Sequence, residues 1–278
     1  MSPLRQAQSA CAEASALLIT SGAGMGVDSG LPDFRGNDGF WKAYPPYQKL
    51  GLQFIEMANP AHFQDDPELG WGFYGHRRNL YRATSPHPGF ARLLAFGESL
   101  PHGYFSFTSN VDGHFQRSGF DPDRVIECHG SIDHLQCVHD CQQQIWPAAA
   151  GEIEVDENTM RADAGSMPRC PDCGALARPN ILMFGDWGWN GGRCAGQESR
   201  YDRWLRTLLD VGARLVILEF GAGRAVPTVR LQSEQVAAAI PGSTLIRVNP
   251  RDSEIEAPCN GISIASGALA FIEQLEIG

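Results

Sequence analysis

Short, continuously apolar runs recur along the chain, and glycine, proline or polar residues bound each of them. Such runs, without polar alternation, are typical of strands buried on both faces of a parallel sheet. Five runs fit this description: 14–20, 103–110, 124–128, 213–220 and 243–249. Helical periodicity lies between several of them, as in 200–211 and 229–239. The alternation predicts an α/β fold built on a Rossmann-like, doubly wound parallel sheet.

Four of the eight cysteines are concentrated in two short motifs, CVHDC and CPDCG. They are Cys137, Cys141, Cys170 and Cys173. Two pairs of sulfurs on tight turns can converge on one tetrahedral ion, and four thiolates complete the shell of a structural zinc. In a chain of this size the clustering favours metal over disulfides. A chance grouping of thiols is the alternative, and His139 could compete as a ligand.

Two segments interrupt the strand–helix alternation. Residues 37–100 are rich in aromatic side chains and are expected to be helical, and residues 131–178 contain the cysteine motifs. The expected division has three parts. Residues 1–36, 101–130 and 179–278 form a Rossmann-like NAD-binding domain, 37–100 form a helical insertion with a cofactor loop, and 131–178 form a zinc-binding module. The last two parts make a smaller lobe.

Composition narrows the range of partners. The chain has 278 residues, 43% of them hydrophobic, so it can bury one good core and carry a smaller module beside it. Its formal net charge of −10 argues against nonspecific binding to nucleic acid or to an anionic membrane. The sequence has no signal-peptide pattern and no apolar run of membrane-spanning length. We therefore expect a cytoplasmic protein that binds small molecules or cationic peptide segments.

A glycine-rich stretch, SGAGMGVDSGLPDFRG (21–36), follows the first apolar run. Glycines let backbone N–H groups approach a phosphate closely. The stretch departs from the dinucleotide pattern G-x-G-x-x-G, so a plain glycine-rich turn is an alternative. Small or polar residues also follow four other runs, in TSNVD, ECHGS, EFGAGR and RVNP. Ligands of open α/β sheets collect at the carboxyl ends of strands, so these segments together predict one ligand site.

Several motifs, in order, resemble those of the sirtuins, which are NAD-consuming protein lysine deacylases. They are GAGMGVDSGLPDFRG, TSNVDGHFQRSG, CHG, RPNILMFGD and VNP. The resemblance covers the chain from about residue 14 to the C-terminus. It implies a Rossmann-like domain and a smaller zinc-bearing lobe, with NAD and acyl-lysine meeting between them. Gly26, Ser109 and Asp186 stand where the family usually has serine, glutamine and glutamate, so this is a divergent member.

The resemblance also implies roles for single residues. The cofactor-binding set would be Gly22, Ala23, Gly24, Asp33, Phe34, Arg35, Ser109, Asn110, Asp112, His129, Gly221, Ala222, Gly223 and Asn249. Within it, Asn110 and Asp112 would line the nicotinamide pocket, and Phe34 would shield the reactive sugar carbon from water. Phe184 and Gly185 would pair with the substrate peptide as an added strand.

The implied chemistry depends on keeping water away. A weakly nucleophilic acyl oxygen can capture a cationic ribose carbon only in a dry site. A base must then activate a ribose hydroxyl, and His129 has the right type and titration range. The catalytic set would be His129, Asn110 and Asp112, and the products nicotinamide, O-acyl-ADP-ribose and free lysine. A core histidine bonded to backbone is the alternative for His129.

Tyr74 and Arg77 stand three residues apart and would share one face of a helix. They resemble the Y-x-x-R pair of class III sirtuins, which accept succinyl and malonyl lysine. A guanidinium and a phenol can together bind the distal carboxylate of such groups. Solvated helix charges at Arg77 and Arg78 are the alternative.

Two other activities stay open, a sirtuin-type protein ADP-ribosyltransferase and an NAD hydrolase. Such transferases depart from the family at the catalytic histidine, whereas this chain keeps His129, which favours deacylation. The expected cofactors are NAD and zinc, and the expected partner is an acylated lysine of a protein or peptide. The sequence does not predict the oligomeric state.

Overall fold

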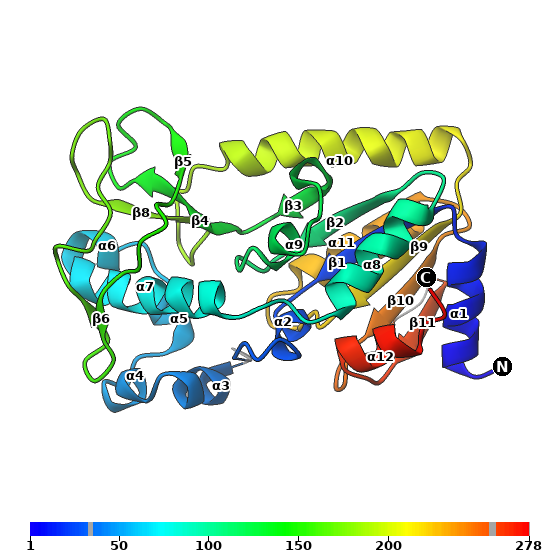
Figure 1. The fold of residues 1–278 in the computed structure, drawn as a ribbon, viewed down its shortest axis with the longest axis horizontal. Helices are drawn as coiled ribbons and strands as arrows, with labels where there is room; N and C mark the ends of the chain where they lie inside the picture. Colours follow the sequence, from blue (N-terminus) through cyan, green and yellow to red (C-terminus); the bar gives the residue numbers. More distant parts are fainter. Residues whose placement is uncertain (33–35, 256–259, 278) are drawn as a thin grey trace.

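The structure, a computed structural model, describes residues 1–32, 36–255 and 260–277. Figure 1 shows a large domain built on one sheet and a smaller lobe at its side. The termini both lie in the large domain, and α10 (Gly192–Asp210) leads from the smaller lobe back along the large domain.

The central sheet has six parallel strands in the order β11-β10-β9-β1-β2-β3. The strands are β1 (Ala16–Ser21), β2 (Tyr104–Thr108), β3 (Val125–Glu127), β9 (Leu215–Phe220), β10 (Thr244–Val248) and β11 (Gly261–Ile264). Counted within the sheet alone, this is the doubly wound order 3-2-1-4-5-6 read from the other edge. The predicted fold class is confirmed, and all five predicted runs are strands of this sheet.

Helices cover both faces of the sheet. One face is covered by α1 (Pro3–Glu13), α8 (Gly89–Ser99) and α12 (Ala268–Gln274), and the other by α10 and α11 (Thr228–Ala239). Strand β1 shows how the sequence produces three layers. Leu17 and Ile19 enter the first core, and Ala16 and Leu18 enter the second, because successive side chains point to opposite faces.

The smaller lobe combines helices with a three-stranded antiparallel sheet in the order β5-β4-β8. Its strands are β4 (Gly130–Cys137), β5 (Ile145–Pro147), β6 (Val155–Asp156), β7 (Arg161–Ala162) and β8 (Ala177–Ile181). Its helices are α3 (Gly36–Ala43), α4 (Pro45–Lys49), α5 (Phe54–Met57), α6 (His62–Asp65) and α7 (Pro67–Ala83). Short elements α2 (Gly24–Val27), α9 (His114–Arg117) and η1 (Pro122–Arg124) follow strands of the large sheet.

Helix α7 is seated closely on the module that contains the cysteines. The Nε1–H of Trp71 donates to the carbonyl of Ala177 in β8 at 2.9 Å. A Cβ atom at Gly72 would lie 1.9 Å from the carbonyl oxygen of Met160, and one at Gly75 would lie 2.6 Å from Ile153. These glycines let the helix backbone touch the module, so the position of α7 depends on the module being folded.

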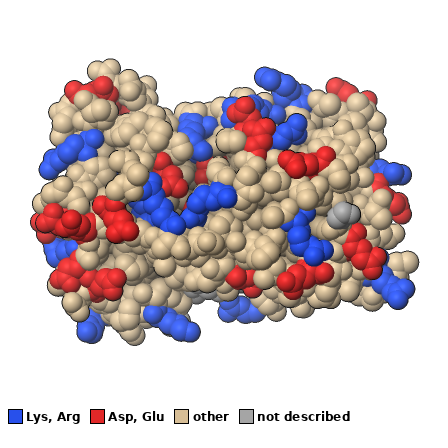
Figure 2. All heavy atoms as spheres, viewed as in Figure 1, with Lys and Arg blue, Asp and Glu red and all other residues tan. Residues whose placement is uncertain are grey.

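The expected three-part division stays a prediction. Strand β8 crosses its boundary between residues 178 and 179, and the whole strand pairs with β4. Basic and acidic side chains are interspersed on the face shown in Figure 2. Within the described part of the chain, none of the helices has both the length and the apolar composition needed to cross a bilayer.

Candidate active site

The loops after β1 and β9 meet where the strand order reverses, which is the usual ligand crevice of such sheets. The N–H of Gly24 donates to the carbonyl of Gly221 at 3.2 Å. A Cβ atom at Gly221 would lie 2.4 Å from Cα of Gly24, and Gly221 has a φ of +59°. Only glycine fits this position without strain. The Gly24 N–H expected to face a pyrophosphate therefore joins the two loops, which leaves the phosphate role to Ala23 as a proposal.

Asn249, at the end of β10 (Figure 1), holds the loop after β9 from the other side. Its Nδ2 donates to the carbonyl of Ala222 at 3.0 Å. Its Oδ1 accepts from the N–H groups of Arg251 and Asp252, each at 3.0 Å. The side chain is fully buried. Asn249 thus shapes the loop of Ala222 and Gly223 through its own amide, and any contact of this loop with adenosine is a proposal.

Asn110 and Asp112 follow β2 and lie against the glycine-rich loop. The Nδ2 of Asn110 donates to the carbonyl of Gly22 at 3.1 Å, and the N–H of Ser109 donates to that of Ser21 at 3.1 Å. Asp112 is buried and its Oδ1 accepts from the N–H of His114 at 2.9 Å. The structure therefore brings these residues to the same strand ends as Gly22.

The carboxyl group of Asp112 is in an unusual electrostatic setting. Burial raises its pKa, and the charges of Arg117 and Arg77 act in the opposite direction. A Cβ atom at Gly26 would lie 3.7 Å from Oδ2 of Asp112, so the residue that replaces the family's serine lies directly beside this carboxyl group.

His129 lies between β3 and β4, half-buried, at the carboxyl end of β3. Burial lowers the pKa of its imidazole, and a hydrogen bond with the Ser109 backbone opposes that shift. The backbone bond is what a structural histidine would have, but the incomplete burial leaves the ring accessible. The carbonyl of His129 accepts from the N–H of Leu182 at 2.9 Å, so the segment after β8 runs beside it.

That segment contains Phe184 and Gly185, the residues expected to pair with a peptide. The N–H of Phe184 donates to the carbonyl of Ala58 at 2.9 Å, and Gly185 has a φ of +67°. Asp186 is buried beneath the turn, where it forms a 2.6 Å ion pair with Arg178. The turn is therefore held from inside at a fixed place next to His129.

Tyr74 and Arg77 are both buried on α7. The guanidinium carbon of Arg77 lies 5.1 Å from the ring centroid of Phe73 and 5.7 Å from that of Tyr74. Arg78 is buried as well and donates to the carbonyl of Gly151 at 3.0 Å. The alternative that Arg77 and Arg78 are solvated helix charges is therefore wrong.

The four cysteines converge as the sequence predicts. Their sulfurs all lie within 4.8 Å of one another, with 3.7 Å between Cys137 and Cys173 and 3.6 Å between Cys141 and Cys170. Four sulfurs at ~2.3 Å from a central zinc ion would be about 3.8 Å apart, so the arrangement fits this ion. Within the described residues the ligand group consists of these four cysteines, and His139 contributes its backbone N–H to the sulfur of Cys137 at 3.4 Å.

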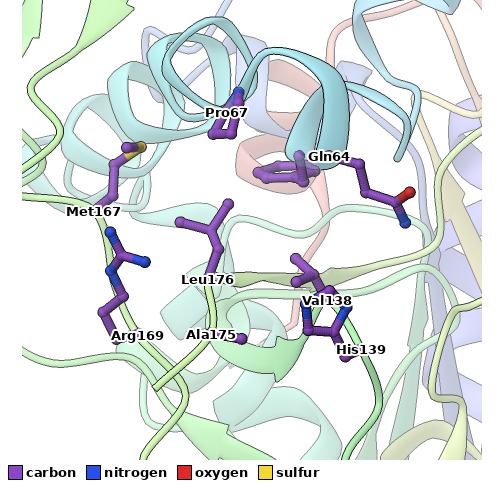
Figure 3. A pocket seen from close by; sticks show the side chains of 9 residues that line it. Gln64, Pro67, Val138, His139, Met167, Arg169, Ala175 and Leu176 are labelled. Atoms are coloured by element: carbon purple, nitrogen blue, oxygen red, sulfur yellow. The ribbon is translucent and has the colours of Figure 1, made fainter. Parts of the chain in front are cut away.

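A cavity of about 470 Å³ lies between α6 and the cysteine module, away from these strand ends (Figure 3). Phe63, Pro67, Val138, Met167 and Leu176 give it an apolar lining, with His139 and Arg169 beside them. None of the residues expected to bind NAD or to act in catalysis lines it, so this cavity is not the candidate active site.

The expected cofactor residues Asp33, Phe34 and Arg35 lie outside the described residues. Sequence reasoning also missed residues that position the site. Ser21 donates to Oγ1 of Thr108 at 2.8 Å, and this oxygen accepts from the N–H of Asn110 at 3.0 Å. Tyr81 contacts Arg77, and its position one helical turn further along α7 is a signal that the sequence contained.

The family model described as the Sir2 family matches residues 22–191, which is more than half of the chain. The chain belongs to the Sir2 family. The match includes the glycine-rich loop, His129 and all four clustered cysteines. The resemblance to sirtuins that the motifs indicate is therefore confirmed.

Curated relatives of this Sir2-family protein have a consistent name. An NAD-dependent protein deacylase of Aquifex aeolicus is 33% identical over 170 residues, which are 61% of this chain and 62% of the relative. The mitochondrial NAD-dependent protein deacylase sirtuin-5 of Danio rerio is 33% identical over 192 residues, 63% of this chain and 58% of the relative. The chain thus spans about three fifths of these relatives. An NAD-dependent protein deacylase of Aeropyrum pernix is 29% identical, covering 92% of this chain and 89% of the relative.

Solved structures agree with the fold. A Sir2 homologue in complex with NAD superposes with a TM-score of 0.67 at 23% identity, over 98% of this chain and 92% of that one. A mutant Sir2 homologue in complex with ADP-ribose has a TM-score of 0.67 at 24% identity, over 97% and 94%. NAD and zinc are the cofactors of this Sir2-family protein, as expected from its family and from its four-cysteine cluster.

Proposed function

We propose that this Sir2-family protein removes acyl groups from protein lysines and consumes NAD, with nicotinamide and O-acyl-ADP-ribose as products. The observation that carries the proposal is the position of His129. Its ring bonds the backbone of Ser109, and its carbonyl bonds the segment that leads to Phe184. A base thus lies between the cofactor loops and a candidate peptide edge, and the names of the relatives support the same activity.

When bound, NAD would supply an ADP-ribosyl group that its cationic nicotinamide activates for transfer. His129, kept neutral by its lowered pKa, would accept a proton from a ribose hydroxyl at the ring nitrogen not bonded to Ser109. Asp112 would orient the nicotinamide carboxamide. Asn110, whose Nδ2 is bonded to Gly22, would offer its Oδ1 to the same pocket.

Gly22, Ala23, Gly24 and Gly221 to Gly223 would form the backbone cradle of the dinucleotide at the crevice. The close loop contacts support this proposal, because a cradle without side chains lets a ligand reach the main chain. Zinc would be structural, since four thiolates leave it no open position. A cytoplasmic location and the absence of nucleic-acid and membrane partners stay predictions.

A peptide panel tests the activity. The protein is incubated with NAD and otherwise identical acetyl-, succinyl- and malonyl-lysine peptides, and the products are measured by mass spectrometry. We expect deacylated peptide and O-acyl-ADP-ribose in equal amounts. Covalently ADP-ribosylated protein without the acyl product would indicate the transferase alternative, and free ADP-ribose alone would indicate an NAD hydrolase.

We also propose that acidic acyl groups are preferred, with Tyr74 and Arg77 as the residues that bind the distal carboxylate. Replacing Arg77 by methionine keeps an apolar stem and removes the charge. It is expected to lower kcat/KM for the succinyl peptide about 10- to 100-fold, because a charge-assisted hydrogen bond is worth about 1.5–3 kcal/mol. Turnover of the acetyl peptide should change less than about threefold.

Arg78 is the matched control for this substitution. It is the next residue of α7 and is also buried, but it donates to the carbonyls of Ala149 and Gly151. Arg78→Met should affect acetyl and succinyl peptides alike. If Arg77→Met also affects both peptides alike, the acidic preference is wrong while the deacylase activity can stand.

A further inference from the structure

Tyr81 contacts Arg77 one turn further along α7. The hydroxyl oxygen of Tyr81 accepts from Nε of Arg77 at 3.1 Å and from Nη2 at 2.7 Å. Both side chains are buried, with 4% of Tyr81 and 7% of Arg77 exposed. Two donors on one edge of the guanidinium thus share a single fixed acceptor.

Aromatic rings add a second constraint on the same group. The guanidinium carbon lies 5.1 Å from the ring of Phe73, 5.7 Å from that of Tyr74 and 5.4 Å from that of Tyr81. Each distance is within the range of cation–π attraction. The flexible arginine side chain is therefore restrained on several sides, and a restrained group loses less entropy when it binds a ligand.

The clamp holds the guanidinium without cancelling its charge. Burial raises the pKa of Tyr81, so the phenol is neutral near pH 7 even though the positive charge of Arg77 acts in the opposite direction. A carboxylate at position 81 would form an ion pair with Arg77 and compete with an anionic ligand. A phenol gives the same geometric restraint and leaves the positive charge to attract a carboxylate.

We propose that Tyr81 is a positioning residue that sets the acyl specificity of the site by holding Arg77 in place for the distal carboxylate of succinyl or malonyl lysine. The proposal rests on the proposed deacylase function and deepens it. It assigns to Tyr81 no contact with the reacting atoms. Its effect should therefore appear in the affinity for acidic substrates rather than in the chemical step.

Tyr81→Phe tests this role because it keeps the ring and its packing and removes the acceptor oxygen. We expect KM for the succinyl peptide to rise about tenfold, which corresponds to about 1.4 kcal/mol. kcat for that peptide, and both constants for the acetyl peptide, should stay within about twofold. The equilibrium dissociation constant of the succinyl peptide, measured by calorimetry, should rise by the same factor as KM.

Tyr201→Phe is the matched control. Tyr201 is another buried tyrosine, and its hydroxyl accepts from Nε2 of Gln232 at 3.2 Å in the core between α10 and α11. It should lose similar stability in thermal unfolding without any change in acyl selectivity.

Three results would overturn the positioning role. An unchanged KM for the succinyl peptide in Tyr81→Phe would show that the clamp is not needed, and an equal loss on acetyl and succinyl peptides would show a merely structural role. A wild-type protein that turns over acetyl but neither binds nor turns over succinyl and malonyl peptides would overturn it and leave the deacylase proposal intact. Absence of binding and of turnover with every acyl peptide would overturn both proposals together.

Discussion

Replacing His129 by asparagine is expected to lower kcat for deacylation by about two to four orders of magnitude, the usual contribution of a positioned general base. Asparagine keeps a polar side chain of similar reach but cannot accept and hold a proton. Release of nicotinamide precedes the step that needs this base. Exchange of labelled nicotinamide into NAD should therefore persist in the variant while formation of O-acyl-ADP-ribose is lost. Both are measured by mass spectrometry in the same reaction.

His102→Asn is the control, because His102 precedes β2 and lies at the opposite end of the strand from Asn110. It should keep wild-type turnover. A His129 variant with more than about a tenth of the wild-type kcat would contradict the assigned role.

The pH profile gives a second measurement of the same group. Burial holds the pKa of His129 below the ordinary value, so the neutral base persists to lower pH than for an exposed histidine. kcat/KM should therefore be insensitive to this group at neutral pH and fall on the acid side, with a midpoint below about 6.5. An acid midpoint above that value would indicate that the imidazole is not held in its neutral form.

Loss of the metal is expected to unfold the smaller lobe and to abolish activity with it. The variant Cys137→Ser/Cys170→Ser removes one ligand from each motif, and apparent zinc-binding free energies of about 10–16 kcal/mol are part of the folding energy of such modules. We expect bound zinc, measured by elemental analysis, to fall from about one ion per chain to none. Limited proteolysis should cut within 131–178, while the large domain resists.

His139→Ala is the control for this pair. His139 is exposed in the first motif, and its contribution to Cys137 comes from the backbone, which the substitution retains. It should keep its zinc and its thermal stability. A chelated protein that keeps its unfolding temperature and its resistance to protease would contradict a structural metal.

The large sheet could be predicted because its central strands carry an unambiguous pattern. Leu17, Leu18 and Ile19 are apolar in succession because β1 is covered on both faces, and β9 is similar. The edge strand β11 was missed because its residues are alternately exposed and half-buried. Helix α10 begins at Gly192 rather than near residue 200, since the glycine-containing start GRCAGQES lacks helical periodicity although Cys194 and Gln197 are buried.

The small sheet was harder to predict for a related reason. Its strands bury polar groups: Gln136, Arg178 and Asn180 are all buried, and Nδ2 of Asn180 donates to the side chain of Gln136 at 2.9 Å. A pattern of apolar residues does not reveal a strand that is stabilised by side-chain hydrogen bonds. The cysteine cluster, by contrast, followed directly from spacing, because the metal rather than packing dictates those positions.

For the candidate site, the sequence located the strand ends but not the bonds between them. Asn110 and Gly22 could be assigned to one edge of the sheet because parallel strands end together there. The hydrogen bond between them depends on the paths of two loops, which local sequence does not determine. The role of Tyr81 depends on which rotamer Arg77 adopts inside the lobe, so the spacing alone was not sufficient.

The backbone contact between Gly24 and Gly221 has a consequence for laboratory evolution of this protein. Two main chains that touch directly tolerate no added methyl group, so saturation libraries at Gly22 or Gly221 should return almost only inactive clones. Altered nucleotide preference would then have to be selected at neighbouring positions with open space. Gly223 meets that condition, because a Cβ atom there would contact nothing within 4 Å.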